Sequence, residues 1–143
     1  MILSAQQTFS DNQAITATAV STNVIDTGVR GTPYDAAAAL NGDIGDGTDI
    51  PVLVQVTENF NTLTSLTISI ETGSTTSLGT EIASQTIVLA DLSAGKQMNL
   101  RILPNGIKER YLGVRYTVTG TPPTTGKVTA GISMGNQTNV TGA

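Results

Sequence analysis

Apolar and polar residues alternate with a period of two along much of this chain. Side chains that follow one another in a β-strand point to opposite faces, so the alternation predicts strands with one buried face. The clearest examples are residues 50–57, 65–71, 97–103, 111–119 and 127–134. The side chains expected to face the core from these segments are Ile50, Val52, Val54, Val56, Leu66, Ile68, Ile70, Met98, Leu100, Ile102, Leu112, Val114, Tyr116, Val118, Val128, Ala130, Ile132 and Met134.

Three further segments show weaker strand patterns. Residues 84–90 predict a buried strand, and residues 14–20 and 23–28 predict two short strands near the start. Polar residues between the apolar ones, including Ser69 and Glu71, are expected to face solvent. About eight strands with one apolar face each must close against a second sheet. The sequence therefore predicts an all-β fold, an antiparallel β-sandwich with jelly-roll topology, and an immunoglobulin-like sandwich is the alternative.

Some segments lack this alternation. Residues 29–49 are predicted to form a long loop, and loops of this length in a compact domain are usually functional or disordered. Tyr34–Leu40 is the one helix candidate, because its alanine run favours helix and Gly42 follows as a stop. Residues 1–9 are expected to form an N-terminal arm on a single domain that spans residues 1–143.

The composition excludes several classes of chemistry. Cysteine, histidine and tryptophan are absent, and aromatic residues make up 3% of the chain. Without cysteine or histidine there is no disulfide, no thiolate or imidazole metal ligand and no Ser-His-Asp triad. The first residues do not resemble a secretory signal, and no apolar stretch is long enough for a membrane-spanning helix. We therefore expect no cofactor, no enzymatic activity and no membrane partner.

Charge is divided unevenly along the chain, whose formal net charge is −4. Residues 1–91 contain ten acidic residues and one basic residue, whereas residues 92–143 contain six basic residues and one acidic residue. Either the molecule has oppositely charged faces suited to oriented docking, or strands from both parts interleave and the charges mix. Six scattered basic residues with little aromatic support do not form a phosphate-binding groove, so no nucleic-acid partner is expected.

The segment NGDIGDGTD places Asp43, Asp46 and Asp49 three residues apart among glycines. Carboxylates can bind Ca²⁺, but this spacing departs from calcium-binding loops and alternates between the two faces of an extended chain. A pair of catalytic carboxylates would need a substrate cleft, which the sequence does not indicate. The preferred interpretation is a turn-rich loop, either solvated or ordered against a partner that offsets the cost of ordering glycine-rich backbone.

Four stretches of the chain resemble one known family. They are Glu109–Ile132 (ERYLGVRYTVTGTPPTTGKVTAGI), Gln7–Gln13 with the pattern Q-x-x-S-D-x-Q, Ser21–Asp26 (STNVID) and Ile50–Thr72. In this order and spacing, they are similar to the capsid cement proteins of short-tailed phages, a family of small jelly-roll proteins on the outside of phage heads. No catalytic motif carries over, because the family has none.

The resemblance implies a structural protein of the virion. Such a protein would be assembled in the host cytoplasm, lie on the outer capsid surface, bind the major capsid protein and stabilise contacts between its subunits. The resemblance also implies self-association, as a homodimer or alternatively as a trimer. A calcium-dependent binding or adhesin module, and a tail or fibre component of a virion, remain alternative functions.

Three regions are candidates for contacts with a partner: the long loop Thr32–Asp49, the arm Met1–Phe9 and a basic hairpin, Lys108–Arg115. An arm can pair with the exposed strand edge of a neighbour. A simpler alternative remains open for each region, in which the loop caps the sandwich, the arm is disordered and the hairpin tip is solvated. The residues expected at these contacts are Met1, Ile2, Leu3, Phe9, Tyr34, Leu40, Asp43, Asp46, Asp49, Lys108, Arg110 and Arg115.

Overall fold

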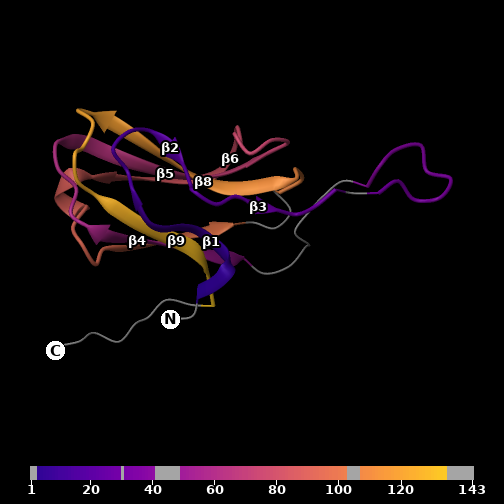
Figure 1. Cartoon of the computed structure of the whole chain (residues 1–143), viewed down its shortest axis with the longest axis horizontal. Coiled ribbons are helices and arrows are strands. Elements are labelled where there is room, and N and C mark those ends of the chain that lie inside the picture. Colours follow the sequence, from indigo (N-terminus) through magenta and orange to yellow (C-terminus); the bar gives the residue numbers. More distant parts are fainter. Residues whose placement is uncertain (1–2, 30, 41–48, 103–106, 135–143) are drawn as a thin grey trace.

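Two antiparallel β-sheets face each other in the computed structural model, which describes residues 3–29, 31–40, 49–102 and 107–134. Figure 1 shows the two layers with their strands labelled. The four-stranded sheet contains β1 (Leu3–Ala14), β9 (Lys127–Ser133), β4 (Ile50–Glu58) and β7 (Gln97–Ile102), in that order. The five-stranded sheet contains β2 (Ala19–Val20), β8 (Tyr111–Gly120), β5 (Leu63–Gly73) and β6 (Thr80–Val88), and β3 (Ile25–Asp26) also pairs with β8.

The pairing of strands is nested from the ends of the chain inward. The first strand, β1, pairs with the last, β9; β2 and β3 pair with β8; β4 pairs with β7; and β5 and β6 form the central hairpin. A ribbon of paired strands that is rolled across two sheets in this way is a jelly roll. The predicted all-β antiparallel sandwich is therefore confirmed, and its connectivity is that of the jelly roll rather than of the immunoglobulin-like alternative.

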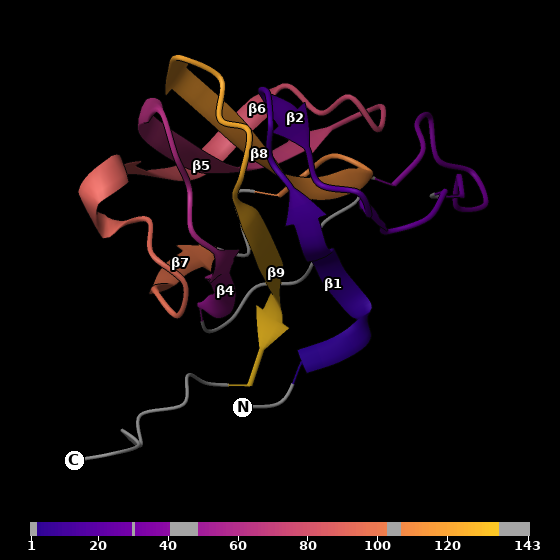
Figure 2. The ribbon, with the colours of Figure 1, turned by 60° about the vertical axis from the view of Figure 1, so that its left-hand side comes forward.

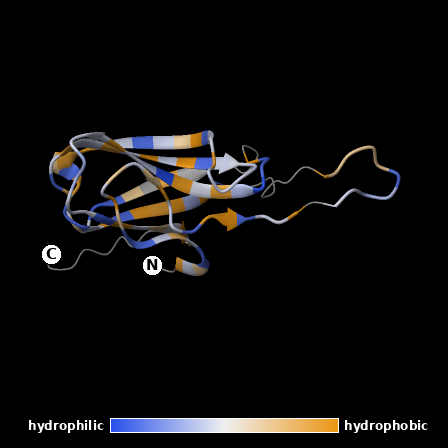
Figure 3. Cartoon of the chain, turned by 45° about the horizontal axis from the view of Figure 1, so that its top comes forward, coloured by the Kyte–Doolittle hydropathy of each residue, from blue (hydrophilic) through white to orange (hydrophobic). Residues whose placement is uncertain are grey.

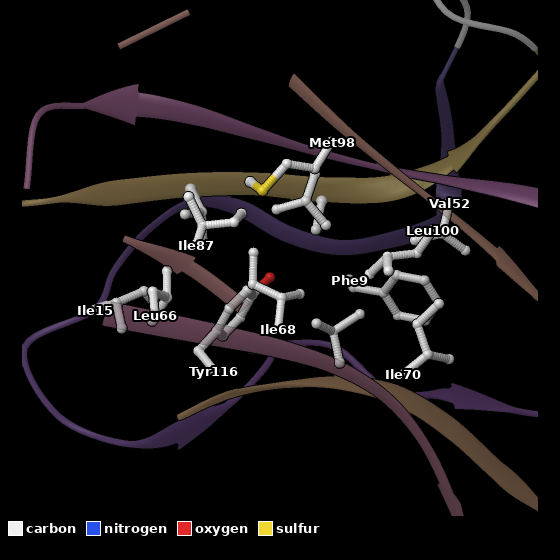
Figure 4. Packing of buried hydrophobic residues seen from close by; sticks show 14 of the residues in the cluster. Phe9, Ile15, Val52, Leu66, Ile68, Ile70, Ile87, Met98, Leu100 and Tyr116 are labelled. Atoms are coloured by element: carbon white, nitrogen blue, oxygen red, sulfur yellow. The ribbon is translucent and has the colours of Figure 1, made fainter. Parts of the chain in front are cut away.

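The core lies between the two sheets and is built from the alternating positions. Figure 4 shows side chains from both layers meeting there, with Phe9, Ile68, Ile70 and Tyr116 among them. β-Branched and leucine side chains favour this packing because they fit a pleated surface with one buried face. The expected inward-facing residues that are buried are Val52, Val54, Val56, Leu66, Ile68, Ile70, Met98, Leu100, Leu112, Val114, Tyr116, Val128 and Ala130.

A polar network joins the two sheets through the core. The hydroxyl oxygens of Tyr116 on β8 and Ser10 on β1 lie 2.8 Å apart, and Ser10 donates to Gln13 Oε1 at 2.7 Å. Gln13 Nε2 donates in turn to the carbonyl oxygen of Val20 at 3.0 Å. Burial raises the pKa of the Tyr116 hydroxyl, and its hydrogen bond with Ser10 opposes this rise. The network satisfies a phenol that would otherwise be buried without a partner.

Some positions differ from the expectation that polar residues face solvent. Ser69 and Glu71 of β5 are buried: Ser69 donates to Glu71 Oε1 at 3.0 Å, and Arg115, which binds Glu71, also donates to the Ser77 carbonyl oxygen in the loop of residues 74–79. Leu78 of this loop lies against Gly113, where an added Cβ would come within 2.8 Å of Leu78 Cδ1. Met134, expected inside, is exposed because β9 ends at Ser133.

The predicted helix over Tyr34–Leu40 is wrong. The described residues 31–40 form turns and bends, and η1 (Leu89–Asp91) is a single 3₁₀ turn elsewhere. Seven residues are too few for a helix to be stable alone, whatever their alanine content, and this segment has no core contact to support one. Asp35 also adopts a φ of 62°, which is outside the right-handed helical region.

The segment expected to be an N-terminal arm is part of the four-stranded sheet from Leu3 onward. β1 pairs with β9 through three register shifts, the widest of which lies between Leu3 and Thr8. Figure 2 shows the resulting curve in β1. The Thr8 side chain donates to the Ser4 carbonyl oxygen at 2.9 Å across this bulge. Strands interrupted by bulges bend and twist more strongly than regular strands.

Candidate protein-binding surfaces

Residues 31–40, the projecting segment, lie beyond one end of the sandwich. Figures 1 and 3 show this segment extending away from both sheets, with hydrophobic positions along it. Tyr34 has a relative exposure of 103%, and Leu40 has 58%. Val29, on the approach to the segment, has 78%. Exposed apolar side chains that are grouped in this way are typical of protein-protein contacts.

The shape of the projecting segment is set by local backbone hydrogen bonds. The Ala36 amide donates to the Pro33 carbonyl oxygen at 3.1 Å, which closes a turn with Tyr34 and Asp35 at its corners. The positive φ of Asp35 is the conformation that the third residue of a type II turn requires. The Leu40 amide donates to the Gly31 carbonyl oxygen at 3.2 Å, so the segment turns back on itself. Tyr34 is thereby presented at a corner of the turn.

Residues 26–28, the root of the projecting segment, are fixed to the sandwich by an ion pair. Arg110 donates through Nε and Nη2 to the two carboxylate oxygens of Asp26, at 2.7 and 2.6 Å. These hydrogen bonds, and one from the Gly28 amide, lower the pKa of Asp26 to about 2. The Thr27 amide and hydroxyl both donate to the Arg110 carbonyl oxygen, at 2.9 and 2.8 Å. The chain therefore leaves β3 in a defined direction.

The expected basic hairpin is divided between structural and exposed residues. Arg110 belongs to the root described above. Arg115 Nε donates to both carboxylate oxygens of Glu71, at 3.0 and 2.9 Å, and its Nη2 donates to the Ser77 carbonyl oxygen at 2.7 Å. Lys108 is exposed. Lys108 is therefore the one of these three basic residues that takes part in neither of these two salt bridges.

The uneven distribution of charge along the sequence is mixed by the fold. Three ion pairs link the described residues: Arg110 with Asp26, Arg115 with Glu71, and Lys127 with Glu58 at 2.7 Å. Each joins an acidic residue of the first part of the chain to a basic residue of the second. These pairs favour the interpretation in which strands from both parts interleave.

The expected arm and acidic loop are described only in part. Met1 and Ile2, and likewise Asp43 and Asp46, lie outside the described residues. Phe9 is completely buried, so its side chain belongs to the core rather than to a surface. Leu3 and Asp49 are half-buried. Across the ranges that the structure describes, no group of three acidic, histidine or cysteine side chains is arranged to hold a metal ion.

A shallow groove of about 460 Å³ runs beside β1. Its lining includes Leu3, Ala5 and Thr8 of β1, Thr22 and Asn23 from the connection between β2 and β3, and Thr129 of β9. The sequence did not indicate this groove, because it depends on the bend in β1. The contact residues predicted from the sequence omit the exposed Val29, although an apolar residue at the start of the predicted loop 29–49 is a usable signal.

The fold and these surfaces define a jelly-roll protein with three exposed apolar side chains, Val29, Tyr34 and Leu40, on or beside a projecting segment. The family model of Bbp16 matches residues 9–132, and the chain belongs to this phage-associated family. No curated protein matches the chain. No helix among the described residues is long and apolar enough to span a membrane.

Among solved structures, the chain is similar to that of the PBSX exported protein XepA. The two are 15% identical, with a TM-score of 0.42. The match covers 94% of this chain and 40% of XepA, so the chain spans less than half the length of that protein. This similarity is too low to bear on function.

Proposed function

We propose that this chain is a capsid cement, or decoration, protein that binds the outer surface of a phage head. In this proposal it contacts the major capsid protein, stabilises the junctions between capsid subunits and catalyses no reaction. The phage-associated family and the jelly-roll fold support a structural role in the virion. The observation that carries the proposal is the projecting segment with its fully exposed Tyr34.

Tyr34 is suited to act as the anchor of such a contact. Tyrosine is enriched among the residues that contribute most to binding, because it buries a large area and loses little conformational entropy. Its position at the corner of a turn allows the ring to enter a pocket of the capsid surface. Leu40 and Val29 would add apolar contact on either side of this anchor.

The root of the segment favours docking in one orientation. The Arg110–Asp26 ion pair and the Thr27 hydrogen bonds hold the base of the segment before any partner binds. A segment that is already held at its base loses less entropy on binding than a free tail. Lys108, which is exposed near this end of β8, would add electrostatic attraction to an acidic capsid surface.

Cementing a shell requires many modest contacts rather than one strong contact. A molecule that touches two capsid subunits binds the assembled shell more tightly than separate subunits, and it therefore shifts the equilibrium toward the shell. Self-association of the chain would increase this effect by joining two docking segments. We therefore include a second copy of the chain among its partners.

Electron microscopy of purified phage particles tests this proposal. The chain should appear on the exterior of the head, with residues 31–40 against the capsid surface. Tyr34→Ala should weaken binding to heads stripped of this protein by roughly 30-fold, which corresponds to about 2 kcal/mol for an anchor residue. Met134→Ala is a matched control, because Met134 is also an exposed apolar residue, with 85% relative exposure, but lies outside the segment.

Met134→Ala should leave binding within a factor of about three, as expected for an interface-neutral substitution. Equal binding by the Tyr34→Ala variant and the unmodified chain would contradict the role of the segment. Particles with the chain on the tail, or absent from the head exterior, would contradict the cement function itself.

A further inference from the structure

Leu53 on β4 is buried outside the core of the sandwich. Its relative exposure is 1%, yet it does not belong to the core cluster that contains its neighbours Val52 and Val54. Because consecutive side chains of a strand point to opposite faces, Leu53 lies on the outer face of the four-stranded sheet. It pairs there with Gly131 of β9. The outer face of this sheet therefore contains a buried apolar side chain that packing between the two sheets does not explain.

The first residues of β1 lie over this part of the outer face. A Cβ added to Gly131 would lie 3.4 Å from Leu3 Cδ2 and 3.3 Å from the Gln7 carbonyl oxygen. Paired residues of neighbouring strands lie close together, so Leu3 is within reach of Leu53. Residues 3–7, which we call the strap, thus cross the outer face beside Leu53, and the missing side chain at Gly131 gives them room.

The part of β1 that follows the strap is firmly held to the sandwich. Phe9 is buried in the core, and the hydroxyl oxygens of Ser10 and Tyr116 lie 2.8 Å apart. Asn23 donates from its amide to the Phe9 carbonyl oxygen at 2.9 Å, and from its side chain to the Thr8 carbonyl oxygen at 2.8 Å. These contacts with β8 and with the connection between β2 and β3 fix the second part of β1.

The strap itself has fewer contacts. It pairs with β9 at Leu3 and Ser133, and the register then shifts before Thr8, where Figure 2 shows the curve in β1. No strap residue belongs to the core cluster, and residues 4–7 are exposed. The hydrogen bond from Thr8 to the Ser4 carbonyl oxygen lies within β1, so it joins the strap to no other strand. Segments with few buried contacts open at lower free energy than the core strands.

A buried hydroxyl opposes the closed position of the strap. Ser133, the partner of Leu3 on β9, has a relative exposure of 3%, and its Oγ has no hydrogen-bond partner in the structure. A hydroxyl that is buried without a partner destabilises the state that buries it, because its hydrogen bonds with water are lost. Packing of Leu3 therefore favours closure, whereas desolvation of Ser133 favours opening.

We propose that the strap opens about the bulge of β1 while the rest of the sandwich stays folded. Opening exposes Leu53 and returns the Ser133 hydroxyl to water, and the fixed part of β1 keeps its pairing with β9. The strap thus controls whether the outer face of the four-stranded sheet presents an apolar side chain. The inference needs no capsid, so it goes beyond the proposed cement function and can be tested on the isolated chain.

The first test measures how fast a maleimide modifies an introduced thiol in the folded chain. The chain contains no cysteine, so Leu53→Cys and Val54→Cys each carry a single thiol. Both positions are buried and adjacent on β4, but Val54 faces the core, so its thiol reacts only when the sheets separate. Relative to the rate that its own global unfolding allows, as measured by urea denaturation, Leu53→Cys should react at least about tenfold faster.

Three further substitutions, each made in the Leu53→Cys background, show whether the strap is the element that opens. Leu3→Ala should raise the modification rate roughly tenfold, because it removes the side chain that favours closure. Ser133→Ala should lower the rate by about threefold or more, because the closed state no longer buries an unpartnered hydroxyl. Gln6→Ala, at an exposed position of the strap, is the matched control and should leave the rate within about twofold.

Hydrogen exchange followed by mass spectrometry gives a second measurement on the unmodified chain. Amides of residues 3–8 should exchange much faster than global unfolding allows, whereas those of residues 9–14 should remain protected. Equal protection of the two parts of β1 would overturn the proposal. So would a Leu53→Cys rate that matches global unfolding, or one that Leu3→Ala does not raise and Ser133→Ala does not lower. Particles without the chain on the head exterior would instead contradict the cement function and leave this inference standing.

Discussion

An aromatic side chain is buried in the sandwich, whereas another is exposed in the projecting segment. Phe9 on β1 has no exposed surface, and it packs among residues of both sheets. Tyr34 in the projecting segment is fully exposed. Both aromatic residues lie near the start of the chain, and neither belongs to a clear alternating pattern. The contrast therefore arises from where the fold places each residue rather than from its local sequence.

The contrast also separates stability from binding. Burial of apolar surface is the main favourable term in folding, so the side chains between the sheets carry the stability of the molecule. The projecting segment contributes two described backbone hydrogen bonds of its own and no residue to the core cluster. Its apolar side chains are available to a partner, and changing them should alter binding without altering the fold.

The largest expected effect comes from truncating the two aromatic residues in parallel. Phe9→Ala should lower the free energy of unfolding by about 3–5 kcal/mol, because it removes a buried ring and leaves a cavity. Tyr34→Ala should change the free energy of unfolding by less than about 0.5 kcal/mol, as surface substitutions usually do. Urea denaturation followed by circular dichroism measures both values. A loss of stability in the Tyr34→Ala variant comparable to that of Phe9→Ala would remove the distinction between the regions.

Much of the sandwich could be predicted because alternation is a local signal. The inward positions of β4, β5 and β8 follow from residues two apart, and the structure buries Val54, Ile68 and Val114 as expected. β1 carries almost no such signal. It is an edge strand with three register shifts, so its few buried residues, such as Phe9, do not recur with a fixed period.

The candidate surfaces were predictable only in outline. The absence of alternation in residues 29–49 indicates a long loop, and the structure exposes Tyr34 and Leu40, two of the predicted contact residues in it. The roles of Arg110 and Arg115 could not be predicted, because their partners Asp26 and Glu71 are distant in sequence and meet only through strand pairing. Neighbouring basic residues in a sequence therefore do not define a basic surface.

A second contrast, between two loops, gives an intermediate effect. The loop of residues 74–79 is held against the sheet by Arg115, which joins it to Glu71, whereas the projecting segment lies free of both sheets. Glu71→Gln should lower the free energy of unfolding by about 1–3 kcal/mol, because the partly buried Arg115 side chain loses its charged acceptor. Thermal denaturation measures this loss.

Glu81→Gln is the matched control for this change. Glu81 is exposed and accepts a hydrogen bond from Ser84 at 2.8 Å, so its neutralisation should shift the free energy of unfolding by less than about 0.5 kcal/mol. Equal effects of the two substitutions would show that the loop is held by other contacts, such as that of Leu78 with Gly113.

The smallest effect is expected where the two regions join, at the ion pair between Asp26 and Arg110. Because the pKa of Asp26 is lowered from 3.8 to about 2, the folded chain binds fewer protons than the unfolded chain between these values. The stabilisation is complete above pH 3.8 and is lost as the pH falls through about 2. The stability difference between the unmodified chain and Asp26→Asn should follow this course, and in an Arg110→Gln background it should shrink at every pH. A difference independent of pH would mean that the pair does not stabilise the root.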